Sequence, residues 1–410
     1  MKQLDKKTFL ALWLFNPFIS AIYVFRNFKE NVHIAPYLLL SFFFGLSFVV
    51  STTGGDSERY AAELVRYHQD SVSLVQVLDE AYGEGGSKLD IYQPFLTWFV
   101  SIFTENTKIL FSIFAVVFGY FWFKTLIIIR SHINIPLKGI ALLTFILLAL
   151  TNPIWQINGV RMWTAVAVFF YGIVLIHLKK EKKGWFFLVL PVFIHFSLIA
   201  SLGLYIAYTL LPSKNTTILL IIFIASFFLG QLDLNFVRET FALLPGMIQS
   251  KEAYLGEEYV EVLSEKKADH ALHFLLAGIL QKYIFFSMVI IIYYYGVFKR
   301  NLLDKNLKIF FPMALFFLSF SNIASSVPSG GRFAVLSNLI LMTIFLLFLN
   351  YNVKLTRSIN FLLRITMVFV IVFLIRTGME SVGPFFFIGN PILNWLIVDS
   401  PIIEFIKSPF

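Results

Sequence analysis

The stretch NPIWQINGVRMWTAVAVFFYGIVLIH, residues 152–177, decides how the rest of the chain is interpreted. It is an apolar run of membrane-spanning length, and an arginine, Arg161, stands near its beginning. Charge near hydrocarbon is costly, so this guanidinium needs a partner. It either reaches out to lipid headgroups or binds an anion, and the remainder of the sequence bears on that choice.

The composition is that of a membrane protein. Of the 410 residues, 58% are hydrophobic and 14% are charged, whereas soluble domains carry about 25% charged residues. Apolar runs recur from one end of the chain to the other, which predicts an all-α polytopic membrane protein with about ten to twelve membrane helices. No long-period repeat is evident, so we expect residues 1–410 to form a single membrane domain.

Several function classes are disfavoured by what the chain lacks. The net charge of +9 is explained by the positive-inside bias and by anionic lipid, which argues against a nucleic-acid partner. Cysteine is absent, which excludes thiolate chemistry, and no nucleotide-binding or common hydrolase motif predicts a cofactor. The spacing of Asp269, His270 and His273 is too loose to predict a metal site.

Basic residues set the expected orientation. The helix that begins near Arg161 ends at a basic cluster, which marks the cytoplasmic side and places Arg161 on the outer side. The acidic segment 52–90 and the polar segment 231–270 are expected outside as well, as parts of the active site. The basic cluster consists of Lys179, Lys180, Lys182 and Lys183.

Local signals predict where some segments begin and break. Asn16-Pro17 divides an N-terminal run that we expect to be interfacial or re-entrant. Ser57 is a candidate N-cap for a helix that follows the outward span. The number of crossings requires Trp185–Leu211 to form a hairpin that turns near His195, unless Thr217–Gly230 does not cross.

Arg332 shares the setting of Arg161. Each begins an inward helix after an external loop that contains glycine and asparagine. A helix N-terminus offers free N–H groups, and a guanidinium adds a fork of donors that matches phosphate oxygens. Two such positions on one side of the membrane suggest a diphosphate site, with Asn158 and Trp163 beside Arg161. The alternative is a pair of interfacial arginines in contact with lipid headgroups.

Two titratable groups are candidates for proton transfer. Asp56 follows an outward span, and its carboxylate is placed to act as a general base toward a sugar hydroxyl. Glu58 and Arg59 beside it are better explained as capping or solvated residues of a helix. His195 lies within an apolar run, where a histidine is either functional or bonded to a backbone carbonyl.

At Asn158-Gly-Val-Arg161-Met-Trp-Thr-Ala165 and at Ile194-His195-Phe-Ser197, the chain resembles the EpsG and Wzy-like family of bacterial polysaccharide polymerases. That family typically shows an N-x-x-R-x-x-x-A pattern at the start of a membrane helix, followed by a helix with an (F/I)-H-x-S element. The acidic stretch Asp56–Tyr60 and the late Arg332 also fit. Met162 stands where the family often has glutamine.

The resemblance implies a membrane glycosyltransferase of the GT-C kind in the bacterial inner membrane. Such enzymes join glycan repeat units carried on undecaprenyl diphosphate at the outer, periplasmic face, with membrane lipids and a chain-length regulator as further partners. We expect Arg161 and Arg332 to hold the donor diphosphate, with Asn158 beside them. Asp56 or His195 is then expected to accept the proton of the acceptor hydroxyl.

Three other functions remain open at this stage. An O-antigen ligase-like enzyme uses the same donor but a different acceptor. A transporter or flippase for lipid-linked sugars predicts internal repeat symmetry, which the chain does not show. A membrane acyltransferase that uses His195 would require a second polar partner within the membrane, and none is identified.

Overall fold

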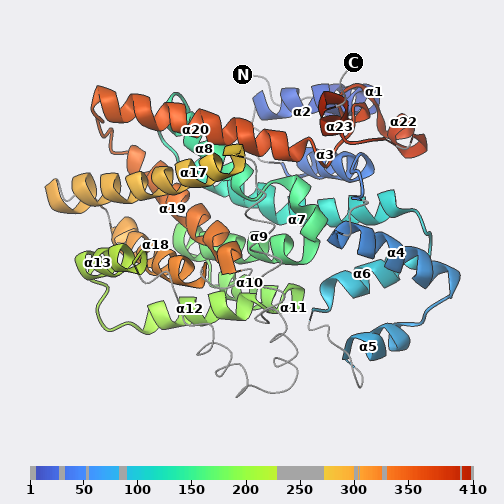
Figure 1. The fold of residues 1–410 in the computed structure, drawn as a ribbon, viewed down its shortest axis with the longest axis horizontal. Coiled ribbons are helices and arrows are strands. Elements are labelled where there is room, and N and C mark those ends of the chain that lie inside the picture. The colour runs from blue at the N-terminus through green and yellow to red at the C-terminus, as the bar shows by residue number, and fades with distance from the viewer. Residues whose placement is uncertain are drawn as a thin grey trace. The chain divides into compact units, whose positions relative to one another are not determined.

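The computed structural model of the chain is drawn in Figure 1. It describes residues 6–26, 33–51, 55–82, 90–228, 272–299, 303, 305–325, 330–397 and 399–407. Within these ranges the regular structure is helical, and the only extended pairing is one bridge between Phe48 and Val382. The predicted external segment 231–270, with Asp269 and His270, lies outside the described residues.

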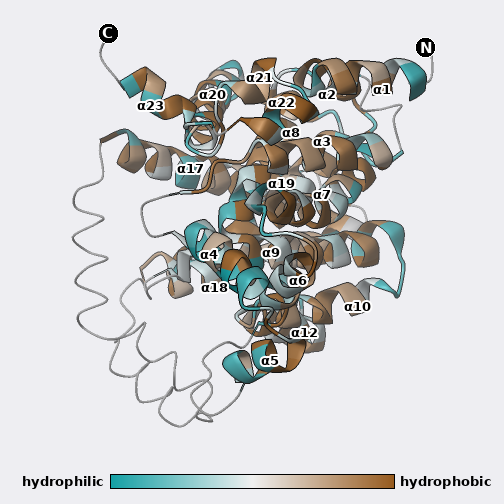
Figure 2. Ribbon diagram, turned by 90° about the vertical axis from the view of Figure 1, so that its right-hand side faces the viewer, coloured by the Kyte–Doolittle hydropathy of each residue, from teal (hydrophilic) through white to brown (hydrophobic). Residues whose placement is uncertain are grey.

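The described helices include many that are suited to a membrane, and Figure 2 shows hydrophobic residues along most of them. Six stretches are long and apolar enough to cross: Thr107–Ser131, Ile140–Lys179, Leu272–Lys299, Leu307–Ala324, Gly330–Leu349 and Arg357–Gly378. Shorter apolar helices are Pro17–Arg26, Ala35–Leu46, Gly184–Ile194, Leu198–Leu210 and Thr216–Ser226. The chain is therefore an all-α polytopic membrane protein, as predicted.

The chain divides into two compact units. Unit 1 consists of residues 1–132, 152–198 and 374–410, and unit 2 of residues 133–151 and 199–373. The helices of unit 1 that bear on the site are α1 (Lys6–Phe15), α2 (Pro17–Arg26), α3 (Ala35–Leu46), α4 (Asp56–Gln69), α5 (Leu74–Tyr82), α6 (Tyr92–Ser101), α7 (Thr107–Ser131), η1 (Ile154–Gly159), α9 (Val160–Val174), α10 (Gly184–Val189) and α11 (Pro191–Ile194).

Helix α9 is the buried centre of unit 1. Every residue from 164 to 174 is buried, because α9 is apolar around its whole circumference and α7, α10 and α11 pack against it. Its N-terminal end, by contrast, carries Arg161. The segment that the sequence identified as decisive is therefore a core helix with one charged end.

Unit 2 is organised around α19 (Phe333–Leu349), a helix that is as apolar as α9. It packs against α8 (Ile140–Thr151), α17 (Leu272–Ile291) and α18 (Lys305–Ala324), and α18 also contacts α13 (Thr216–Ser226). The remaining helices of this unit include α12 (Leu198–Leu210), the 3-10 turn η5 (Gly330–Arg332) and most of α20 (Arg357–Gly378).

Two predicted helix breaks are confirmed, and one predicted cap is wrong. Helix α1 ends at Phe15 and α2 begins at Pro17, with the Asn16 side chain accepting from the backbone N–H of Ile19 at 2.9 Å. The chain is also interrupted at His195, between α11 and α12. Ser57 is not the N-cap of α4.

The N-cap of α4 is Gly55, whose backbone is extended, so the helix begins at Asp56. Ser57 lies inside the first turn, where its side chain is fully buried. Its hydroxyl accepts a hydrogen bond from the backbone N–H of Ser51 at 3.3 Å. A serine held in this way by the preceding segment is not free to cap the helix, and residue preferences alone do not reveal such a contact.

Helices α3 and α7 approach closely because small residues face each other where they cross. A Cβ atom on Gly45 of α3 would lie 2.5 Å from the carbonyl oxygen of Phe111 and closer still to Cα of Ser112. On α7, a Cβ atom on Gly119 would collide with the side chain of Ser41. Backbone contact through small residues is a common way to join membrane helices.

We predict that Gly45→Ala destabilises unit 1 by about 1–3 kcal/mol, because the added methyl group meets backbone atoms that cannot turn away. Gly203→Ala in α12 is the matched control, since a Cβ atom there has nothing within 4 Å. The measurement is the thermal unfolding midpoint of each variant in detergent. Equal midpoints for the two variants would contradict the close approach of α3 and α7.

Candidate functional site

Helix α4 supplies one wall of the candidate site. Tyr60, Leu64 and Tyr67 recur at helical spacing and are buried, so they form the inner face. The first turn carries Asp56, Glu58 and Arg59. Burial raises the pKa of Tyr60 above its ordinary value, an effect that the nearby Arg161 charge partly offsets. The phenol therefore keeps its proton at neutral pH.

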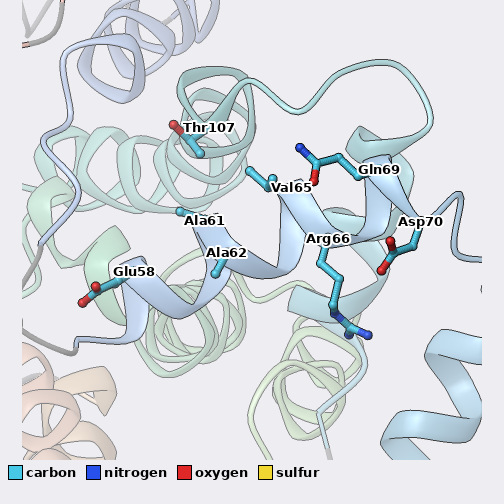
Figure 3. A pocket seen from close by; sticks show the side chains of 8 residues that line it. All are labelled: Glu58, Ala61, Ala62, Val65, Arg66, Gln69, Asp70 and Thr107. Carbon is cyan, nitrogen blue, oxygen red and sulfur yellow. The ribbon is translucent and has the colours of Figure 1, made fainter.

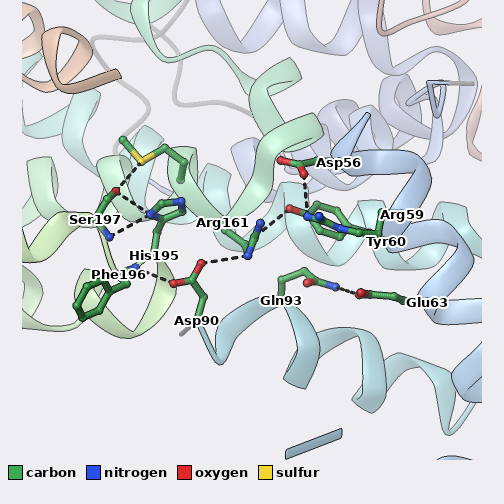
Figure 4. Close-up of polar contacts among 11 residues, drawn as sticks. Asp56, Arg59, Tyr60, Glu63, Asp90, Gln93, Arg161, His195, Phe196 and Ser197 are labelled. Carbon is green, nitrogen blue, oxygen red and sulfur yellow. Dashed lines mark hydrogen bonds and ion pairs between the residues drawn. The ribbon is translucent and has the colours of Figure 1, made fainter. Parts of the chain in front are cut away.

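Arg161 is the second residue of α9 and is bound by two groups of unit 1, as Figure 4 shows. Its Nε atom donates to the hydroxyl of Tyr60 at 3.1 Å, and its Nη1 atom donates to Oδ2 of Asp90 at 3.2 Å. The Arg161 side chain is 22% exposed and that of Asp90 is 8% exposed. A cation at the start of a core helix is therefore neutralised inside the protein.

Asp90 is the site residue that sequence reasoning missed. In the sequence it is one of several acidic residues of segment 52–90, and it was not singled out. Its second oxygen, Oδ1, accepts from the backbone N–H of Phe196 at 2.7 Å. Asp90 therefore links the start of α9 to the turn that contains His195. The available signal was its position, because a carboxylate directly before an apolar half-helix requires a partner.

His195 ends α11 with an extended backbone, and its Nδ1 atom holds the following turn together. Nδ1 lies 2.7 Å from Oγ of Ser197 and accepts from the backbone N–H of Ser197 at 3.3 Å. An Nδ1 that accepts carries no proton, so the neutral ring is protonated on Nε2. A further contact ties this region to α6, since the N–H of Ile91 donates to the carbonyl of Phe193 at 3.2 Å.

Asp56 lies at the edge of the same cluster. It forms an exposed ion pair with Arg59 at 2.8 Å, a kind of pair that contributes little to stability. Its Oδ2 atom lies 3.8 Å from the position that a Cβ atom of Gly159 would occupy, and the indole of Trp163 lies 3.2 Å from the same position. The first turn of α4 therefore lies within van der Waals distance of the start of α9, near the exposed Asn158.

Arg332 has the local setting that was predicted for it. It is exposed, it is the last residue of η5, and α19 begins at the next residue. Arg161 likewise follows a 3-10 turn, η1, at the start of α9. Both arginines therefore stand at helix beginnings. Arg332 belongs to unit 2 and Arg161 to unit 1, and their joint role in diphosphate binding stays a prediction.

A hollow of about 540 Å³ lies along α4, with Thr107 of α7 also in its lining (Figure 3). Its small residues lie at the middle of the helix, and its polar groups lie toward both ends. Arg66 in this lining is held by Glu80 of α5 through two bonds of 2.8 and 2.7 Å. The lining residues are Glu58, Ala61, Ala62, Val65, Arg66, Gln69, Asp70 and Thr107.

We predict that His195→Leu destabilises the protein by about 1–2 kcal/mol, because the backbone N–H of Ser197 loses its acceptor and its hydroxyl keeps only the sulfur of Met162. His195→Asn is the matched control, since its side-chain oxygen takes the place of Nδ1. The measurement is the thermal unfolding midpoint in detergent. An Asn variant as unstable as the Leu variant would show that the Nδ1 contacts do not support the turn.

The sequence profile of the EpsG family matches residues 9–387, nearly the whole chain. No curated protein and no solved structure gives a significant match. The matched range contains all the residues that form the cluster around Arg161, together with Arg332 of unit 2. The chain therefore belongs to the EpsG family, membrane proteins of the polysaccharide-polymerase type.

Proposed function

We propose that the protein is a polysaccharide repeat-unit polymerase of the bacterial inner membrane. It transfers a glycan from undecaprenyl diphosphate to another lipid-linked repeat unit at the periplasmic face. The observation that carries this proposal is the arginine at the start of α9. Arg161 is oriented by Tyr60 and lies in a polar cluster that also holds Asp90, with Asp56 at its edge. Family membership supports the same class of activity.

Arg161 is suited to hold the donor diphosphate. A guanidinium has five N–H donors, and the contacts with Tyr60 and Asp90 use two of them in the described part of the chain. The adjacent N-terminus of α9 adds backbone N–H groups and a favourable dipole for an anion. Charge that develops on the departing diphosphate is stabilised there, which lowers the barrier to transfer. Arg332, at the start of α19, supplies a second cation in this proposal.

Asp56 is the better candidate for the general base. Its ionised carboxylate only accepts hydrogen bonds and is partly exposed, beside Gly159 and near the start of α9. In His195, Nδ1 is occupied by Ser197 and Nε2 carries the proton of the neutral ring, so this side chain is a donor as it stands. In this proposal His195 supports the turn that Asp90 contacts.

The proposed reaction balances without a cofactor. The acceptor hydroxyl transfers its proton to Asp56, and its oxygen forms a bond to the anomeric carbon of the donor sugar. The bond between that carbon and the phosphate oxygen breaks, and its electron pair leaves with the diphosphate at Arg161. The products are a longer lipid-linked glycan and a lipid diphosphate.

The hollow along α4 is suited to the acceptor glycan. It extends from Glu58 to Asp70, a distance of about 18 Å along a helix. Carboxylate and amide groups at its ends bind sugar hydroxyls, and alanines at its middle leave room for a ring. The positive charge of Arg66 is balanced by Glu80, and the other charged groups of the lining are the carboxylates of Glu58 and Asp70, so the hollow disfavours an acidic sugar.

We predict that Arg161→Ala and Arg332→Ala each lower polymer synthesis about 100- to 1,000-fold, the range expected when a donor to a developing anion is removed. The measurement is polymer formation from lipid-linked repeat units by purified protein in lipid nanodiscs. Arg357→Ala is the matched control, because Arg357 also begins a helix, α20. It follows the helix that starts at Arg332 and is expected to run inward, so Arg357 is expected on the cytoplasmic side. Polymer at wild-type level from both variants would refute the proposal.

We also predict that Ala62→Trp shortens the polymer while the first transfer still occurs, because the indole fills the hollow and not the donor site. Val75→Trp is the control, since Val75 of α5 is exposed and does not line the hollow. Chain length is read from the size distribution of the product on a gel. If Ala62→Trp makes polymer of unchanged length, the hollow does not bind the acceptor glycan.

A further inference from the structure

We propose that Asp90 is the resting counter-anion of Arg161 and that the diphosphate of the donor displaces it. Asp90 thereby lowers the affinity of the site for lipid diphosphates and favours release of the product. This inference rests on the proposed function, in which Arg161 binds the diphosphate. It adds a residue that competes with the substrate for the same guanidinium.

The geometry of Asp90 is asymmetric. Oδ1 is held by the backbone N–H of Phe196 at 2.7 Å, whereas Oδ2 contacts Nη1 of Arg161 at 3.2 Å. The carboxylate is therefore anchored through one oxygen by the main chain. Loss of the contact with Arg161 leaves Asp90 in place, because the anchor does not depend on the arginine.

The ion pair itself is loosely made. Charge-assisted N–H···O bonds are typically about 2.7–2.9 Å long, and strong arginine–carboxylate pairs are often bidentate. The Arg66–Glu80 pair of the same unit has that form, with two bonds of 2.8 and 2.7 Å. Arg161 and Asp90 share a single, longer contact. A ligand that offers two phosphate groups makes better use of the guanidinium.

Arg161 remains oriented when Asp90 is displaced. Its Nε atom is bound to the hydroxyl of Tyr60 at 3.1 Å, and Tyr60 is fully buried on α4. The guanidinium is thus fixed at one edge by a neutral group and paired at another by a charged one. These two contacts suit an exchange of anions, because the bond to Tyr60 keeps the guanidinium oriented while Asp90 is replaced by the diphosphate.

The exchange has a consequence for turnover. After transfer, the lipid diphosphate loses its sugar ester and gains a negative charge, so it binds Arg161 more tightly than the donor does. Asp90 offsets this tighter binding of the product, because it regains its ion pair with Arg161 when the product leaves. Asp90, being only 8% exposed, regains little from water and depends on Arg161 for its neutralisation.

The test is direct binding of farnesyl diphosphate to the purified full-length protein in lipid nanodiscs, measured by calorimetry. Asp90→Asn keeps an oxygen for the N–H of Phe196 but removes the competing charge. We expect its Kd for farnesyl diphosphate to fall about tenfold, as one unit charge removed at a partly hydrated site allows. Tyr60→Phe is the matched control, because it removes the other contact of Arg161 and is not expected to tighten binding.

The outcomes separate this inference from the proposed function. Tighter binding to Asp90→Asn alone supports the exchange. Equal or weaker binding to Asp90→Asn than to wild type, with the two proteins unfolding at the same temperature, overturns it. If Asp90→Asn lowers the unfolding temperature, a second comparison is made between the double variant Asp90→Asn/Arg161→Gln and the single variant Arg161→Gln. Tighter binding of farnesyl diphosphate by the double variant overturns the exchange, because Asp90 would then act without Arg161. Binding that survives Arg161→Ala in the wild-type background would instead overturn the role of Arg161 in the proposed function.

Discussion

An arginine at the beginning of a buried helix must have its charge neutralised within the protein, and the site depends on how unit 1 meets that requirement. Arg161 contacts a tyrosine from α4 and an aspartate that precedes α6. These contacts bring two separated segments to the start of α9. Asp90 extends the connection to the turn at His195, so one ion pair and two hydrogen bonds organise the polar cluster.

The helices around this cluster are shaped by two kinds of local feature. Close contact through small residues sets the distance between α3 and α7. The interruption at His195 turns the chain out of a helix and exposes backbone N–H groups, which Asp90 and the histidine itself then satisfy. Irregular backbone in an apolar setting is tolerated for this reason.

Features that depend on residues close together in the sequence were predicted, and features that depend on distant residues were not. The helix beginnings at Arg161 and Arg332 and the breaks at Pro17 and His195 depend on nearby residues, and the sequence predicted each of them. The N-cap of α4 was misassigned because the Ser57 hydroxyl accepts a hydrogen bond from the backbone N–H of Ser51. The sequence singled out Arg161, Asn158 and Asp56, which lie in or beside one polar cluster, but it did not single out Asp90, the carboxylate that contacts Arg161.

The amino-acid sequence by itself determined the class of the protein: recurring apolar runs of spanning length specify a polytopic helical membrane protein, because hydropathy acts locally along the chain. Its short motifs also indicated the family. Only the tertiary structure decided which groups neutralise Arg161, since Asp90 lies 71 residues and Tyr60 lies 101 residues away in the chain. Hydropathy does not encode such pairs, because a carboxylate near an apolar run requires a partner without specifying which cation provides it.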